Sequence, residues 1–278
     1  MSRARGDRLR RTASNADILN HLDLIAFDGD DTLWHNERSY REARARFRRL
    51  LARAGVVLSA QDIDDRVNRT EVANLSLFGY GVSSFVLSLA ETAIDLTEGR
   101  ISGGDLRDLI DLAKQMRTEQ IELFPGARET LTRLAATWPL MLITKGDLLH
   151  QRSKLERSGL IGCFRHVEVV SHKTPDVYTA ILARHGVMPE RFLMVGDSLR
   201  SDVLPVIEAG GWAVHVPAAL SWSHEDAEAP AHMHGRFVEV PALERVPDAI
   251  RALVRTSPSR RAAPAADRRR PAARSRRN

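Results

Sequence analysis

The segment LIAFDGDDTLW, residues 24–34, decides the fold that we expect for the whole chain. Its first four residues are all apolar, which predicts a short strand buried on both faces. Three acids follow this strand, at Asp28, Asp30 and Asp31. Side chains two positions apart in an extended chain lie on the same side, so the carboxylates of Asp28 and Asp30 can converge. They repel each other unless a cation or a proton lies between them, so this segment taken alone is either a ligand site or a solvated acidic turn after a strand.

Three further segments follow in order, each at or just after a predicted strand. They are MLITKGD (141–147), SHKTPDVY (171–178) and FLMVGDSLRSD (192–202). Together with the first segment they resemble the four motifs of the haloacid dehalogenase superfamily, whose members are mostly phosphotransferases that use an aspartate nucleophile and Mg²⁺. The matching residues are Asp28 and Asp30 in the first motif, Thr144 in the second, Lys173 in the third, and Asp197 and Asp202 in the fourth.

The resemblance implies a Mg²⁺ site at the ends of two strands. Asp28, the backbone carbonyl of Asp30 and Asp197 would bind the ion, which prefers hard oxygen ligands. Asp202 would support this first set of ligands from behind. In a parallel sheet, ligands bind where the strand order reverses, which would place Asp28 beside Asp197.

The resemblance also implies a reaction. Asp28 would attack phosphorus and form a phosphoaspartate, while Asp30 would protonate the leaving oxygen and then take a proton from water. Thr144 and Lys173 would hold the phosphoryl oxygens as charge redistributes. These roles predict a Mg²⁺-dependent phosphatase acting on a small phosphorylated metabolite.

Asp30 separates this chemistry from others in the superfamily. The dehalogenases and the phosphonate hydrolases that this chain resembles in fold lack an acid–base aspartate two residues after the nucleophile. Phosphomutases keep it, so mutase activity stays open as an alternative. Asp30 therefore favours phosphate ester chemistry without deciding between hydrolysis and transfer.

The remainder of the chain predicts an α/β core with a helical insertion. From Phe124 onward, apolar strands alternate with helices, which indicates right-handed crossovers and a parallel, Rossmann-like sheet. Between residues 35 and 122, apolar residues recur at helical spacing instead. The resemblance implies the strand order 5-4-1-2-3 and identifies the insertion as a type 1 cap, a helical bundle that closes over the site. We thus expect a core of residues 14–34 and 123–255 and a cap of residues 35–122.

The two ends of the chain are basic and carry no apolar pattern, so residues 1–13 and 256–278 are predicted to be disordered tails. Residues 1–12 carry a net charge of +4 and residues 256–278 of +7, which leaves −6 for the body of a chain whose total is +5. A nucleic-acid-associated protein that uses these tails is the rival class. Clustered arginines without interleaved aromatic residues favour solvated tails, and we expect no nucleic-acid partner.

The cysteine count and the length of the apolar runs bear on the compartment in which we expect the protein. A single cysteine, Cys163, rules out an internal disulfide and suits a reducing cytoplasm. No apolar run approaches the roughly 18 residues of a membrane span. We expect a cytoplasmic protein without a membrane partner.

Specificity should come from residues outside the motifs. Residues 78–81, FGYG, form an aromatic loop in the predicted cap, and Tyr80 is the candidate substrate contact. The alternative is a turn that packs its two aromatic rings between helices. Lys145 stands where the superfamily often has asparagine; it either favours a more anionic substrate or points outward.

Two late segments remain without a role. His232-x-His234 has two of the ligands of a zinc site, but no cysteine or helical histidine spacing accompanies it, and we expect no zinc. Residues 222–225, WSHE, resemble a segment that follows the fifth strand in bacterial hydrolases of the superfamily. We can assign this segment no chemistry from the sequence.

Overall fold

The computed structural model describes residues 22–220, 222, 225, 227, 228, 230 and 235–256. Residues 1–21 and 257–278, with the tail hypotheses that depend on them, lie outside this set, as does His232-x-His234. One boundary was wrong: Thr256, predicted as the first residue of the tail, is the last residue of helix α10 (Val246–Thr256). Within the described residues, no helix is long and apolar enough to cross a membrane.

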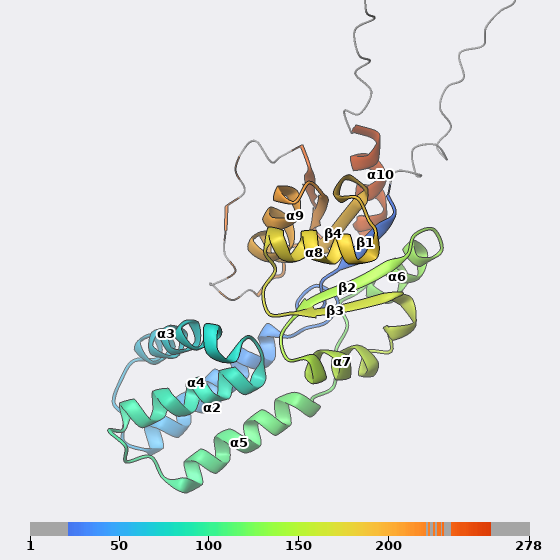
Figure 1. Cartoon of the computed structure of the whole chain (residues 1–278). Coiled ribbons are helices and arrows are strands. Elements are labelled where there is room, and N and C mark those ends of the chain that lie inside the picture. The colour runs from blue at the N-terminus through green and yellow to red at the C-terminus, as the bar shows by residue number, and fades with distance from the viewer. Residues whose placement is uncertain are drawn as a thin grey trace, which may run out of the picture.

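A six-stranded parallel sheet forms the core (Figure 1). Its strands, in chain order, are β1 (Leu24–Phe27), β2 (Leu140–Lys145), β3 (His166–Val170), β4 (Phe192–Gly196), β5 (Trp212–His215) and β6 (Phe237–Glu239). They lie in the order β3-β2-β1-β4-β5-β6, which confirms the predicted α/β fold and the predicted order of the first five. The edge strand β6 was not predicted, because three residues are too few to show an alternating pattern.

Helices cover both faces of this sheet. Alternate residues of β1 point to opposite faces: Ile25 and Phe27 pack with helices α6 (Ala127–Ala135) and α10. Leu24 and Ala26 pack with α8 (Pro175–His185) and α9 (Leu204–Glu208). All four side chains are almost fully buried, which explains why this strand has no polar position.

The segment after β4 differs from its predicted form. A helix was expected from Asp202 to Ala209, but residues Leu199–Val203 form a π-helical turn and α9 starts at Leu204. Pro205 has no backbone N–H to donate to the carbonyl of Ser201. The hydroxyl of Tyr178 donates to that carbonyl instead, at 2.9 Å. The carbonyl of Ser201 therefore keeps a partner in the turn that contains Asp202.

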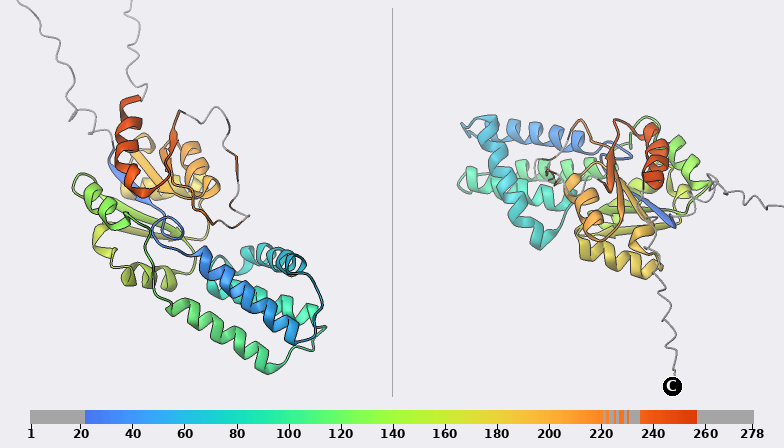
Figure 2. Two further views of the ribbon diagram at one scale, coloured as in Figure 1. Left: turned by 180° about the vertical axis from the view of Figure 1, so that it is seen from behind. Right: turned by 90° about the horizontal axis from the view of Figure 1, so that it is seen from above.

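Four helices form a second unit set off to one side of the core (Figures 1 and 2). They are α2 (Glu37–Arg53), α3 (Ala60–Phe78), α4 (Val82–Leu96) and α5 (Gly103–Thr118), all within the range proposed for the cap. Ser59 and Ser102 cap α3 and α5, each accepting a hydrogen bond from a backbone N–H three residues on. This helical unit has a hydrophobic cluster of its own, centred on Phe47, Phe85 and Leu89.

Candidate active site

Three carboxylates and one ammonium meet at the carboxyl ends of β1 and β4. Lys173 Nζ lies 2.5 Å from Asp28 Oδ1 and 2.6 Å from Asp202 Oδ1. Asp28, Asp197 and Asp202 each offer an oxygen atom, and these atoms lie within 4.8 Å of one another. The pairing of Phe27 with Val195 fixes β1 beside β4 and brings these groups together from distant parts of the chain.

The charges in this cluster do not balance. Lys173 supplies one positive charge to three carboxylates, and its side chain is 1 % exposed. Burial raises the pKa of Asp28 to about 7 against the lowering effect of Lys173. Burial, with the nearby charges of Asp28 and Asp202, also raises the pKa of Asp197 well above its usual value. A cluster of oxygen donors short of positive charge is the donor set that suits a divalent cation such as Mg²⁺.

Thr144 lies at the end of β2 and lines the same pocket as this cluster. Its hydroxyl oxygen is buried and has no hydrogen-bond partner among the described residues. Buried side-chain polar atoms without a partner are uncommon, and each one calls for an explanation such as a missing ligand atom. An oxygen of a bound phosphate would supply that partner.

Asp30 contacts a different set of residues from the three clustered carboxylates. Its oxygens accept hydrogen bonds from Lys154 Nζ at 2.8 and 2.9 Å, from Gln151 Nε2 at 2.8 Å and from Trp34 Nε1 at 2.6 Å. Burial alone would raise the pKa of Asp30, but Lys154 and the other donors outweigh it and hold the pKa below its usual value. The side chain of Asp30 is therefore an oriented carboxylate.

Sequence reasoning did not find Lys154 or Gln151. Both lie on helix α7 (Leu148–Arg157), three residues apart on one face, and both are buried. Lys154 Nζ also lies 2.7 Å from Asn36 Oδ1, just before α2. A glutamine and a lysine three residues apart, in the predicted helix directly after the second motif, were the available signal.

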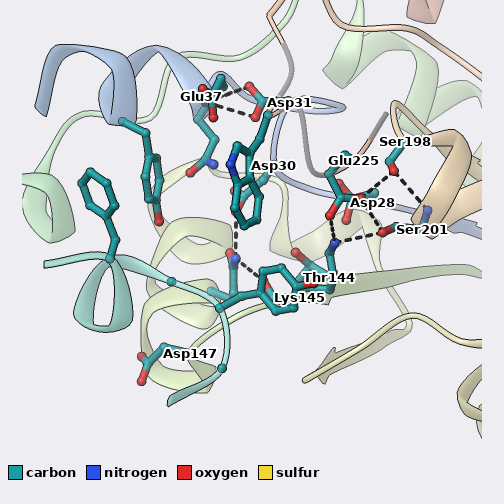
Figure 3. A pocket seen from close by; sticks show the side chains of 18 of the residues that line it. Asp28, Asp30, Asp31, Glu37, Thr144, Lys145, Asp147, Ser198, Ser201 and Glu225 are labelled. Atoms are coloured by element: carbon teal, nitrogen blue, oxygen red, sulfur yellow. Dashed lines mark hydrogen bonds and ion pairs between the residues drawn. The ribbon is translucent and has the colours of Figure 1, made fainter. Parts of the chain in front are cut away.

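Lys145 points into the pocket rather than outward (Figure 3). Its Nζ lies 2.5 Å from Glu225 Oε1 and 2.9 Å from Ser201 Oγ. Glu225 belongs to the β5–β6 connection, residues 216–236, in the segment that the sequence had left without a role. Its other oxygen accepts hydrogen bonds from Ser198 Oγ at 2.6 Å and Ser201 Oγ at 2.5 Å. Against the effect of burial, these donors lower the pKa of Glu225 to about 2.

The helical unit closes the other side of the pocket. Tyr80 lies between Gly79 and Gly81, whose φ angles of 69° and 122° are strained for any other residue. This turn directs the Tyr80 ring at the core, where it lies 4.5 Å from Lys145 Nζ and 6.3 Å from the Trp222 ring. Phe78, in contrast, is 54 % exposed, so the two aromatic residues do not pack together in the turn.

One pocket thus collects every residue that the sequence proposed for the site. Its lining includes the following eight: Asp28, Asp30, Tyr80, Thr144, Lys145, Lys173, Asp197 and Asp202. The pocket brings these residues together from both the core and the helical unit.

Comparisons with characterised proteins bear on the activity. N-acylneuraminate-9-phosphatase of Rattus norvegicus is 29% identical over 163 residues, which cover 55% of this chain and 64% of that protein. Glyceraldehyde 3-phosphate phosphatase of Pyrococcus furiosus is 38% identical over 85 residues, 28% of this chain and 35% of that protein. The chain therefore spans less than two thirds of the curated relatives that it matches.

Comparisons of structure and of family identify the chain more directly. The crystal structure of a haloacid dehalogenase-like family hydrolase from Xanthomonas campestris has 40% sequence identity and a TM-score of 0.75, covering 84% of this chain and 93% of that one. A 2-haloacid dehalogenase from Pseudomonas syringae, at 22% identity and a TM-score of 0.57, shares the fold. The family model for haloacid dehalogenase-like hydrolases matches residues 22–210. The chain belongs to the haloacid dehalogenase-like hydrolase family.

Proposed function

We propose that this protein is a Mg²⁺-dependent phosphatase that hydrolyses a small phosphate monoester through a phosphoaspartate at Asp28. The observation that carries this proposal is the buried cluster of Asp28, Asp197 and Asp202 around Lys173, next to the unpartnered hydroxyl of Thr144. A cluster short of positive charge suits a divalent cation, and the hydroxyl suits a phosphate oxygen. The names of the two matched relatives, both phosphatases, support the same class of reaction.

Some of these residues would bind the metal ion, and others would bind the phosphoryl group. Asp28, Asp197 and the backbone carbonyl of Asp30 would hold Mg²⁺, with Asp202 close enough to serve as a ligand or to support one. When bound, the ion supplies positive charge that offsets the charge of the phosphate. Thr144 and Lys173 would bind the phosphoryl oxygens from the ends of neighbouring strands.

The reaction would proceed in two steps. In the first, a carboxylate oxygen of Asp28 bonds to phosphorus, the ester P–O bond breaks, and Asp30 gives a proton to the leaving oxygen. In the second, water attacks phosphorus, Asp30 takes a proton from that water, the P–O bond to Asp28 breaks, and phosphate is released. The ion pair with Lys154 holds Asp30 as the carboxylate that the second step needs. A dianionic phosphate nearby raises the proton affinity of Asp30 for the first step.

The proposal is tested by phosphate release from a panel of phosphorylated metabolites. We expect activity with Mg²⁺, loss of activity in EDTA and recovery when Mg²⁺ is restored. Asp197→Ala should weaken the affinity for Mg²⁺ and turnover together. The exposed Asp176 provides a matched control, and Asp176→Ala should leave both unchanged. Full activity in EDTA would contradict the metal assignment.

The single Cys163, a free thiol, supports the further expectation that the enzyme acts in the cytoplasm.

A further inference from the structure

The positive charges around the pocket already have partners. Each of the four cationic side chains that line it, in the part of the chain that the structure describes, contacts a carboxylate. The pairs are Arg44 with Glu71, Lys145 with Glu225, Lys154 with Asp30, and Lys173 with Asp28 and Asp202. His150 also lines the pocket, but burial and the charge of Lys154 lower its pKa to about 4, so the ring is neutral near pH 7.

The carboxylates beyond the Asp28, Asp197 and Asp202 cluster are also engaged. Asp147 forms an ion pair with Arg117 at 3.1 Å. Asp31 accepts hydrogen bonds from the backbone N–H groups of Asn36 and Glu37 at 2.9 and 3.0 Å. Beyond the phosphate end, therefore, these charged side chains of the described wall lie in ion pairs or, like Asp31, in hydrogen bonds with the backbone.

Lys145 would be the natural contact for a second anionic group on a substrate, because it follows Thr144 directly. Glu225 takes that position instead. Its carboxylate receives three hydrogen bonds, from Lys145, Ser198 and Ser201, and its side chain is only 16 % exposed. A substrate carboxylate would have to displace Glu225 from these donors or lie beside it unpaired. Both alternatives are unfavourable in a site that excludes much of the solvent.

The remaining wall suits an uncharged group. The rings of Tyr40, Tyr80, Phe85 and Trp222 line it, together with Ser84 and Asn36. Lys145 has three N–H groups, of which Glu225 and Ser201 engage two, and the third can donate to a hydroxyl. Aromatic faces combined with neutral donors and acceptors match the CH and OH groups of a polyol or a sugar.

We propose that the pocket selects phosphate monoesters whose organic part is uncharged and bears hydroxyl groups, and that Glu225 sets this preference by neutralising Lys145. This inference rests on the proposed phosphatase function. It makes Glu225 a specificity residue that works chiefly by exclusion, because it removes the attraction that a free Lys145 would offer to a carboxylate.

Two esters that differ at one carbon test the inference. Glycerol 3-phosphate ends in CH₂OH where 3-phosphoglycerate ends in a carboxylate, and the two are otherwise alike. We expect the wild-type kcat/KM to favour glycerol 3-phosphate by at least about tenfold. If either ester is turned over too slowly, the same ratio is measured as inhibition constants against p-nitrophenyl phosphate.

Two variants should change this ratio in opposite directions. Glu225→Gln frees Lys145 and should reduce the preference for glycerol 3-phosphate at least about tenfold, mainly through KM for 3-phosphoglycerate. Lys145→Met leaves the charge of Glu225 uncompensated and should increase the preference. Glu228→Gln makes the same chemical change at an exposed position of the same connection and should leave the ratio unchanged.

The outcomes separate this inference from the function on which it rests. If the wild-type protein does not hydrolyse p-nitrophenyl phosphate in the presence of Mg²⁺, the phosphatase proposal is overturned, and the inference with it. Hydrolysis combined with an equal or reversed wild-type ratio would overturn the inference alone. So would a ratio that Glu225→Gln leaves unchanged. If that variant fails to fold, the wild-type ratio and the direction of the Lys145→Met change decide.

Discussion

The two ends of the pocket differ in how their charges are arranged. At the core end, three carboxylates share the ammonium of Lys173, and the cluster is short of positive charge. At the end formed by the helical unit and the β5–β6 connection, Arg44 is paired with Glu71 and Lys145 with Glu225. One end is thus suited to take up a cation and a phosphate, whereas at the other end these two cationic side chains, among the described residues, already contact carboxylates.

This difference separates chemistry from specificity. Substitutions at the core end should change the turnover of every phosphate ester. Substitutions at the helical end should change the ranking of esters and leave a minimal ester almost unaffected.

Lys154 should show the larger effect, because it orients Asp30. Lys154→Met should lower kcat for alkyl phosphates by about 10²-fold, since a misplaced acid–base group costs on this order. The effect on p-nitrophenyl phosphate should be smaller in the first step, because its leaving group needs no proton. Steady-state kinetics on both substrates check this, and Lys114→Met, at an exposed ion pair, is the control. If kcat for alkyl phosphates falls by less than twofold, Lys154 is not needed to orient Asp30 for the reaction.

Tyr80 should have a smaller, selective effect. Its ring contacts Lys145 and Trp222 from the helical side. Tyr80→Ala should change the relative kcat/KM of larger esters by about tenfold, the effect of roughly 1.4 kcal/mol, and spare p-nitrophenyl phosphate. The same panel of esters measures both. If the ranking is unchanged, the loop has a structural role only.

Glu71 should affect stability in a pH-dependent way. Burial raises its pKa from 4.5 to about 7, despite its contact with Arg44. Between these values the folded state binds more protons than the unfolded state, so this group's contribution to stability falls as pH rises from about 4.5 to 7. Glu71→Gln removes that dependence, and its Tm relative to wild type should rise by roughly 2–5 °C between pH 5 and pH 8. A relative Tm that falls over this range would mean that the Arg44 ion pair outweighs burial.

The core end could be predicted from the sequence because short motifs fix it. Asp28, Thr144 and Asp197 lie at or directly after the ends of buried strands, and the parallel order of those strands brings them together. Lys173 closely follows the end of the third strand, which brings it to the same edge of the sheet. In these cases local pattern and family resemblance both point to one edge of the sheet.

Two ion pairs of the pocket could not be predicted in the same way. Glu225 meets Lys145 across 80 residues, and Lys154 meets Asp30 across 124, so these contacts depend on how loops and helices pack. Helix α10 was missed for a different reason. Its buried residues Val246 and Ile250 recur at helical spacing, so the signal was present in the sequence but was not used.

Asp28 is proposed to become phosphorylated and Asp30 to move the protons, and the variant Asp30→Asn tests both roles. p-Nitrophenolate leaves without a proton, so this variant should still phosphorylate Asp28. An amide cannot take a proton from water, so hydrolysis of the phosphoenzyme should slow by about 10²–10⁴-fold. Stopped-flow measurements should show a burst near one p-nitrophenolate per site followed by a stall, with one phosphoryl group on Asp28 by mass spectrometry. Asp28→Asn should show no burst. Near wild-type steady-state turnover of both aryl and alkyl phosphates by Asp30→Asn would contradict the account.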